Sequence, residues 1–367
     1  PLSRDPTVKT LLATNPTTPA ELLNAIDVLI DLRALGDADG LLKQLVKAQP
    51  NDEQWAELVQ QFGSALFLRL AFIYDLQPEG RQVADAALEA SARRARDPAR
   101  LTKLIEQLQD PSPAVRRGAR VRLVSGREAA IQALAAALVD PSRQAQHAAI
   151  RTAVVQFGRE ATAPLTALLR SSQPAAQMEA IRALAELGQS LTALDLFAPA
   201  LLETSADEIK TAAREALVAL IGRVPDRDEA TAVLVRKAKS GFATALEEPD
   251  LEALPVLEWH WNEGKAALEY ALSPPLAAHL DRAADLAGDA ARLAPRSREV
   301  AWLALAARVE ADAYRLGVDQ PPPSGPGTAA ALLEAEDADV LDGMLGYSLA
   351  GGHTVAAAAA ARALGQI

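Results

Sequence analysis

Apolar residues recur along most of the chain at the spacing of an α-helix. In the segment PTTPAELLNAIDVLIDLRALG (16–36), they stand three or four positions apart and therefore share one face of a helix. Half of the residues are hydrophobic, mostly Ala and Leu, and only 4% are aromatic. β-branched and aromatic residues at alternate positions are scarce. The pattern therefore predicts an all-α protein without a sheet.

A unit of about 31 residues recurs four times in the centre of the chain. The recurring segments are DPSPAVRRGARVRLVSG (110–126), DPSRQAQHAAIRTAVVQFG (140–158), SSQPAAQMEAIRALAELG (171–188) and TSADEIKTAAREALVALIG (204–222). A second amphipathic stretch precedes each segment, so each unit is predicted to be a helix–turn–helix pair. The Asp, Ser or Thr that opens each segment is suited to a helix cap or a tight turn.

Two small residues recur in every unit. Alanine stands nine positions after the first residue, at Ala119, Ala149, Ala180 and Ala213. Glycine closes each unit, at Gly126, Gly158, Gly188 and Gly222. We expect each alanine to lie where two helices cross, because a larger side chain would push them apart. We expect each glycine to take positive φ at a helix C-terminus.

The segment DPSPAVRRGA, with Asp110 six residues before Arg116, resembles the HEAT repeat, including a short bacterial form named after phycobilisome lyases. In that family the Asp and the Arg form ladders between successive repeats. The other three units carry Gln146, Gln177 and Lys210 at the position of the arginine. The resemblance covers residues 98–222 and implies an α-α superhelix, a HEAT-like α-solenoid. It also implies that these polar residues are structural.

The flanks of the repeats are helical but do not follow the repeat. Residues 1–97 are predicted to be a cap region whose helix pairs resemble tetratricopeptide units. Residues 223–319 are predicted to form irregular helical hairpins of a similar kind, and QPPPSGPG (320–327) has the composition of a linker. Residues 328–367 restart a HEAT-like pair without a polar end cap. We therefore expect the natural protein to continue beyond Ile367.

Charge is distributed unevenly along the chain, whose net charge is −11. The middle segment, residues 91–240, is basic and lies between two acidic flanks. Arginines are densest between residues 93 and 127, where the candidate surface residues are Arg93, Arg94, Arg96, Arg116, Arg117 and Arg120. Such a stretch suits phosphate recognition. A solvated or salt-bridged face is the favoured interpretation, because no aromatic residue is interleaved with the arginines and the pI of the chain is about 5.0.

Trp259, His260 and Trp261 form the most unusual local stretch in a chain so poor in aromatic residues. Tryptophan is enriched at binding hot spots, so the three residues are a candidate recognition surface. The alternative, which the sequence favours, is that the two tryptophans fill a gap where the repeat is interrupted.

Residue patterns for catalysis or metal binding are missing from the sequence. The chain has no cysteine, and its four histidines have no HExxH or other ligand spacing. No GxSxG or phosphate-binding glycine loop is present. We therefore predict no catalytic, cofactor-binding or metal-binding residue and no cofactor. No apolar run approaches the ~20 residues of a membrane span.

These features predict a non-enzymatic bacterial scaffold or adaptor that binds another protein and serves as a subunit of a larger assembly. The alternation of basic and acidic segments also suits self-association. Two other functions stay open: a nucleic-acid binder acting through residues 93–127, and a lyase- or glycosylase-like enzyme on a HEAT scaffold. Nucleic acid is not the favoured partner. The use of Ala and Arg, the start at Pro1 and the lack of cysteine favour an exported or periplasmic location over a cytoplasmic one.

Overall fold

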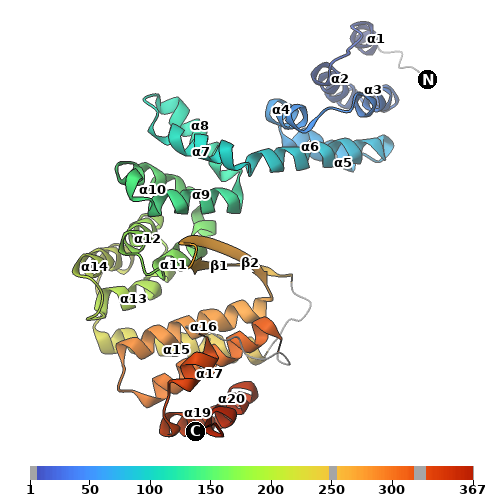
Figure 1. Cartoon of the computed structure of the whole chain (residues 1–367). Helices are drawn as coiled ribbons and strands as arrows, with labels where there is room; N and C mark the ends of the chain where they lie inside the picture. The colour runs from blue at the N-terminus through green and yellow to red at the C-terminus, as the bar shows by residue number, and fades with distance from the viewer. Residues whose placement is uncertain (1–5, 248–253, 318–327, 367) are drawn as a thin grey trace. The chain divides into compact units, whose positions relative to one another are not determined.

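The computed structural model describes residues 6–247, 254–317 and 328–366. It divides into two compact units, Pro1–Ala133 and Leu134–Ile367, each described here by itself. Helices joined by short turns make up nearly all of the described chain (Figure 1). None of the described helices is long and apolar enough to cross a membrane. The predicted linker at 320–327 lies outside the described residues.

The first unit consists of helices, two of which begin at capping boxes. They are α1 (Pro6–Ala13), α2 (Pro19–Asp31), α3 (Leu35–Ala48), α4 (Asp52–Phe62), α5 (Ser64–Phe72), α6 (Glu79–Ala95), α7 (Pro98–Glu106) and α8 (Pro113–Val124). The Thr18 hydroxyl accepts from the Glu21 backbone N–H, and the Glu21 carboxylate accepts from the Thr18 N–H, which completes a capping box at the start of α2. Asn51 and Gln54 form the same reciprocal pair before α4.

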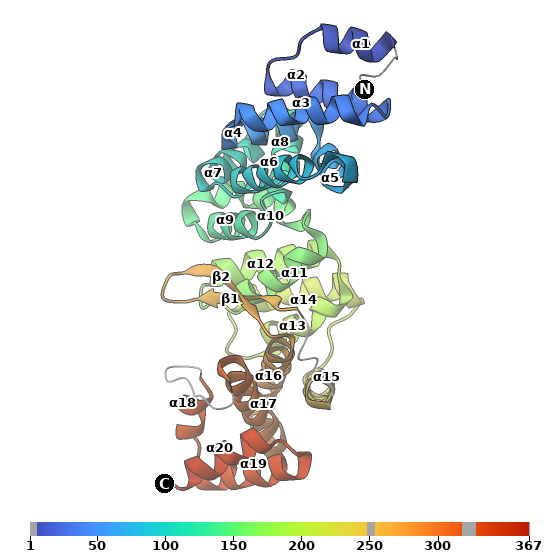
Figure 2. The same cartoon turned by 90° about the vertical axis from the view of Figure 1, so that its right-hand side faces the viewer.

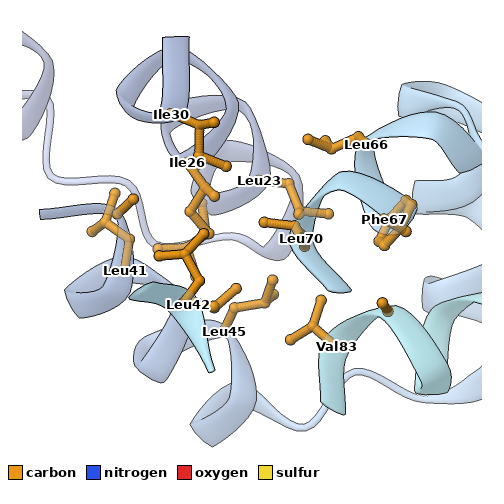
Figure 3. Packing of buried hydrophobic residues seen from close by; sticks show 14 of the residues in the cluster. Leu23, Ile26, Ile30, Leu41, Leu42, Leu45, Leu66, Phe67, Leu70 and Val83 are labelled. Atoms are coloured by element: carbon orange, nitrogen blue, oxygen red, sulfur yellow. The ribbon is translucent and has the colours of Figure 1, made fainter. Parts of the chain in front are cut away.

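The core of this unit is aliphatic. Figure 3 shows Leu23 and Ile26 of α2, Leu42 and Leu45 of α3, and Leu70 of α5 gathered in one cluster, and each is 0% exposed. Burying each such side chain contributes about 1.5–3 kcal/mol. This packing holds together helices that were predicted from the spacing of their apolar residues.

The repeats continue in the second unit as paired helices. Helix α9 (Arg127–Val139) spans the boundary between the units, and α10 (His147–Val155), α11 (Thr162–Leu169), α12 (Pro174–Leu187), α13 (Ala193–Leu201) and α14 (Asp207–Ile221) follow. Two of the predicted small residues behave differently from the rest. Ala149 is only half-buried, because a 3-10 helix at Pro141–Gln146 precedes α10 and Ile150 takes the buried place. Gly126 has no positive φ. It is required by close packing, since a Cβ there would lie 2.9 Å from the Ala95 carbonyl oxygen.

One hydrogen bond recurs in every unit. A side chain in the first turn of the second helix returns to a backbone carbonyl of the loop before it. The four bonds join Arg116 to Asp110 (2.7 Å), His147 to Asp140 (3.3 Å), Gln177 to Ser171 (2.7 Å) and Lys210 to Glu203 (2.9 Å). The ladder between repeats that the family resemblance implied for Arg116 is thus replaced by a bond within its own unit. These residues are structural, because each satisfies a carbonyl group of the turn.

A β-hairpin interrupts the helices, contrary to the prediction that the chain has no sheet. Strands β1 (Val256–Asn262) and β2 (Ala267–Ser273) pair antiparallel, with Trp259 opposite Tyr270. Apolar and polar residues alternate with the period of a strand in LEWHWN (257–262), but this run is short and ALEYALS of β2 does not alternate. The hairpin packs on α11 (Figure 2).

Long helices close the second unit. Helix α15 (Arg227–Glu247) packs on α16 (Pro275–Leu293), which forms the predicted hairpin with α17 (Arg298–Leu316). The last helices are α18 (Ala329–Glu334), α19 (Ala338–Gly351) and α20 (Thr354–Leu364). Two buried carboxylates of α17 cap the helices that follow it. Glu310 accepts from the Ala356 N–H at 3.1 Å, and Asp312 accepts from the Ala329 N–H at 2.8 Å.

Candidate docking groove

A groove of about 1260 Å³ crosses helices α10, α12 and α14 of the second unit. Each of these is the second helix of a repeat, and Figure 1 shows them following one another in that order. Small residues form much of the surface of the groove, and Met178 is its largest flexible apolar side chain. The small apolar residues are Ala148, Ala175, Ala185, Ala212, Ala216 and Ala219. The groove therefore offers an apolar floor that backbones can approach closely.

The residues of the groove stand at equivalent places in three repeats. Counted from Asp140, Ser171 and Thr204, the positions four, seven, eight and eleven residues later all line it. They are Gln144, His147, Ala148 and Arg151 in the first of these repeats, Ala175, Met178, Glu179 and Arg182 in the next, and Glu208, Thr211, Ala212 and Glu215 in the last. This spacing selects one face of a helix, and stacking three such faces makes one continuous surface.

One end of the groove is an ion-pair cluster around Glu179, whose exposed fraction is 4%. Its carboxylate accepts from Arg151 at 2.7 Å and from Arg182 at 2.9 Å, and the His147 ring nitrogen Nδ1 lies 3.7 Å away. Arg151 also bonds to Glu186. Carboxylates of α12 thus engage both arginines of the groove, Arg151 from the preceding repeat and Arg182 from the same helix.

The other end of the groove is acidic. The described residues include no hydrogen-bond or ion-pair partner for the side chains of Glu208 and Glu215 on α14. Asp207 at the start of the same helix contacts Lys210 at 3.4 Å, and its side chain is 99% exposed. The charged residues that line the groove, besides His147, are two arginines and five carboxylates. The groove as a whole therefore carries a negative potential.

Trp259, His260 and Trp261 lie on β1 and border a second cleft, of about 660 Å³, beside α11, α16 and α17. The Trp259 ring packs on Tyr270 with 4.9 Å between centroids. His260 is 3.6 Å from Glu269 of the opposite strand. The structure thus brings the three predicted residues together on the border of a cleft, and it also uses Trp259 in the packing of the hairpin.

The hairpin is fastened to the repeats through its turn. Glu263 accepts from the Ser172 backbone N–H at 2.6 Å and from the Ser172 hydroxyl at 2.8 Å. The hydrogen bond from the hydroxyl is the main cause that holds the pKa of Glu263 below its usual value. Ser172 belongs to the turn between α11 and α12, so the hairpin position is fixed relative to the repeats.

An ion-pair network forms the floor of this second cleft. Arg282 of α16 holds the buried Asp195 of α13 with two hydrogen bonds, the longer of which is 2.9 Å. Arg170, at the end of α11, lies 3.2 Å from Asp285 and 3.7 Å from Asp289. Further pairs join Arg308 to Asp281 (3.1 Å) and to Asp285 (2.8 Å), and Arg315 to Asp281 and to Glu258 (3.6 Å). The network connects the repeats to the α16–α17 hairpin and to β1.

The arginines predicted between residues 93 and 127 lie on α6, α7 and α8 of the first unit and differ in their surroundings. Arg93 makes two 3.0 Å bonds with Asp52, and Arg116 bonds only to loop carbonyls. Arg96 and Arg117 are exposed. One buried nitrogen each of Arg94 and Arg120 has no hydrogen-bond partner among the described residues.

Sequence reasoning missed the groove, although the repeat alignment contained the signal for it. The positions four, seven, eight and eleven residues after each repeat start carry neither the shared alanine nor the closing glycine, so they drew no attention. Charge density instead pointed to the arginines of the first unit. The described residues hold no cluster of three or more His, Asp or Glu side chains placed to bind a metal ion.

Comparison with known proteins supports the same central region. A family model described as HEAT repeats matches residues 131–218, which contain the whole of the groove lining except Ala219. These residues are HEAT repeats, and the prediction of an all-α solenoid fold is confirmed. The first predicted repeat, at 110–126, lies outside the match and stays a prediction. No curated protein and no solved structure matches the chain.

Proposed function

We propose that this HEAT-repeat protein is a non-enzymatic scaffold or adaptor that binds another protein along the groove across α10, α12 and α14. The observation that carries the proposal is the repetition of lining positions in three consecutive repeats. Such a surface gives many modest contacts over a long span rather than one deep pocket. Its apolar floor and charged rim have the anatomy of a protein interface.

The surroundings of the ionisable groups support a binding role over a catalytic one. A general acid or base must come within hydrogen-bond reach of its substrate, which a carboxylate held by arginines does not readily do. In the groove, Glu179 is buried and engaged by two arginines. In the second cleft, Asp195, Asp281 and Asp285 are each paired with arginine. These groups serve the packing of helices.

Filling the groove tests the proposal. The double variant Ala148→Trp/Ala175→Trp places bulk on two exposed positions of the groove without entering the core. Ala358→Trp/Ala361→Trp makes the same change at exposed positions of α20. Both variants and the wild type are tagged, expressed in the source organism, purified, and compared by quantitative mass spectrometry.

We expect a specific partner that the wild type and the α20 variant retain and that the groove variant loses. Equal recovery from all three would contradict the proposal. Light scattering coupled to size exclusion at low and high salt tests whether a second copy of the chain is that partner, because charge-driven self-association weakens with ionic strength.

A further inference from the structure

The arginines that line the groove are paired with carboxylates, whereas two of its glutamates are not paired within the described part of the chain. At the α10–α12 end, the guanidinium groups of Arg151 and Arg182 are occupied by Glu179 and Glu186. At the α14 end, Glu208 and Glu215 have no partner among the described residues. An approaching molecule therefore meets cations that are already neutralised and carboxylates that are not. Charge complementarity favours a basic occupant over an acidic one.

The floor of the groove adds a steric condition. Ala148, Ala175 and Ala212 occupy places where larger side chains would fill the groove, and Met178 lies between the charged ends. Small residues let a helix approach to about 8–10 Å between axes. Methionine adapts to apolar side chains of varied shape. An amphipathic helix can place its apolar stripe on this floor and its polar face toward the rim.

Resting on the proposed function, we propose that the occupant of the groove is a basic amphipathic helix of a partner protein. Its lysines or arginines pair with Glu208 and Glu215, and its apolar side chains pack on the alanines and Met178. The acidic end of the groove fixes the direction in which the helix lies, because its basic residues must face α14. An acidic segment is excluded by the same free carboxylates, since like charges brought together oppose binding.

Three synthetic peptides of about 18 residues, long enough to cross three packed helices, provide the probes. All carry leucine and alanine on one face. The first has lysine on its other face, the second has glutamate there, and the third repeats the lysine peptide with a central proline that breaks the helix. Binding of each labelled peptide to the full chain is followed by fluorescence anisotropy at low and at high salt.

We expect the lysine helix to bind at low salt at least about tenfold more tightly than the glutamate helix, and to weaken at high salt. The proline peptide should bind more weakly than the intact lysine helix. Glu208→Gln/Glu215→Gln should raise the Kd of the lysine helix by about three- to tenfold. Glu334→Gln/Glu336→Gln on and beside α18 makes the same change in net charge away from the groove and should leave the Kd unchanged.

The outcomes separate this inference from the proposed function. Binding of the glutamate helix that equals or exceeds that of the lysine helix, and that Ala148→Trp/Ala175→Trp abolishes, would overturn the basic partner while keeping the groove as a docking site. Binding of the lysine helix that neither groove variant changes would overturn both. Equal binding of the proline peptide would overturn the helical form of the occupant.

Discussion

Two groups of arginines in this protein have opposite surroundings. On α6, α7 and α8 of the first unit, burial lowers the pKa of Arg100, and the nearby charges of Arg94 and Arg122 lower it further. In the second unit, burial of Arg170 works against its charge, but Asp285, Asp289 and Asp195 outweigh that effect and raise its pKa. Arg94, Arg100 and Arg122 of the first unit are thus like charges near one another, whereas Arg170 of the second unit lies among carboxylates.

The comparison shows that the density of arginine along a sequence does not reveal its role. The conspicuous cluster at 93–127 is local, and few carboxylates lie near it in the sequence. The network of the second unit is assembled from distant residues, since Arg282 stands 87 positions from Asp195. The second group therefore stabilises the packing of distant helices, whereas in the first group Arg100 lies among like charges although Arg93 and Arg116 have partners of their own. The predictions that follow test this difference, beginning with the largest expected effect.

Removing the carboxylate at the centre of the network should destabilise the second unit most. Asp195→Ala leaves Arg282 and Arg170 partly buried without their shared partner, at a cost of about 2–3 kcal/mol in the free energy of unfolding, because Arg282 keeps some contact with water. The measurement is the urea midpoint followed by circular dichroism. Asp207→Ala removes a fully exposed carboxylate and should change the free energy by less than about 0.5 kcal/mol. Similar losses in the two variants would contradict a stabilising network.

A smaller loss of stability is expected at a buried carboxylate within α17. Glu310→Ala removes the acceptor for the Ala356 N–H at the start of α20 and should cost about 1–3 kcal/mol, because a buried donor loses its partner. Hydrogen exchange of the amides in α20 measures the effect locally. Glu299→Ala, an exposed carboxylate of the same helix, serves as the control. Unchanged hydrogen-exchange rates of the α20 amides after Glu310→Ala would contradict the claim that Glu310 caps this helix.

The same residue should give a pH dependence of defined sign. Burial raises the pKa of Glu310 above its ordinary value of 4.5, against the lowering effect of hydrogen bonds from Ala356 and Val355. A carboxyl whose pKa is raised on folding favours the folded state while protonated and loses that contribution as pH rises through the folded pKa. Wild type should therefore lose stability relative to Glu310→Gln as the pH rises above the ordinary carboxyl value of 4.5. A wild-type urea midpoint that rises or stays constant relative to that of Glu310→Gln as the pH rises would contradict this assignment.

The smallest effect is expected where arginines repel one another. Arg100→Gln removes one charge from the set that includes Arg94 and Arg122 and should stabilise the first unit by about 0.3 kcal/mol at low salt. Arg93→Gln removes the partner of Asp52 and should not stabilise it. Thermal unfolding of the full chain at low and high salt measures both, and the gain from Arg100→Gln should shrink as salt screens the repulsion. A loss of stability in Arg100→Gln would show that the attraction of Asp97 outweighs the repulsion by Arg94 and Arg122.

Local sequence signals predicted most of the helices but only part of the tertiary structure. Thr18 and Asn51 cap the helices that their sequence context indicated, because capping depends on neighbours within four residues. The β-hairpin was missed although Trp259 and Trp261 alternate with polar residues, because this alternation is confined to β1 and is weak beside a chain of helical periods. Ala149 was misplaced because a 3-10 turn shifts its helix within an otherwise regular repeat.

The candidate site was accessible from the sequence in principle. The alignment of the three repeats shows which positions lie on the same face of each second helix. Met178 occupies the seventh position after its repeat start, and Glu208 and Glu215 occupy the fourth and the eleventh after theirs, so all three belong to that face. Which of the charged residues are free could not be predicted, because Arg151 meets Glu179 and Glu186 only through the stacking of α10 on α12. The ion pairs around Asp195 could not be predicted for the same reason, because they join residues that are distant in the sequence.

Photo-crosslinking in the source organism tests the central claim, that the groove and not the arginine cluster or the tryptophan cleft is the docking surface. A photoreactive residue is placed singly at Met178, at Arg117 and at Trp259, and cross-linked peptides are identified by mass spectrometry. The account predicts adducts at position 178 that map to a basic helical segment of one partner. Adducts confined to position 117 or to position 259, with none at 178, would contradict it.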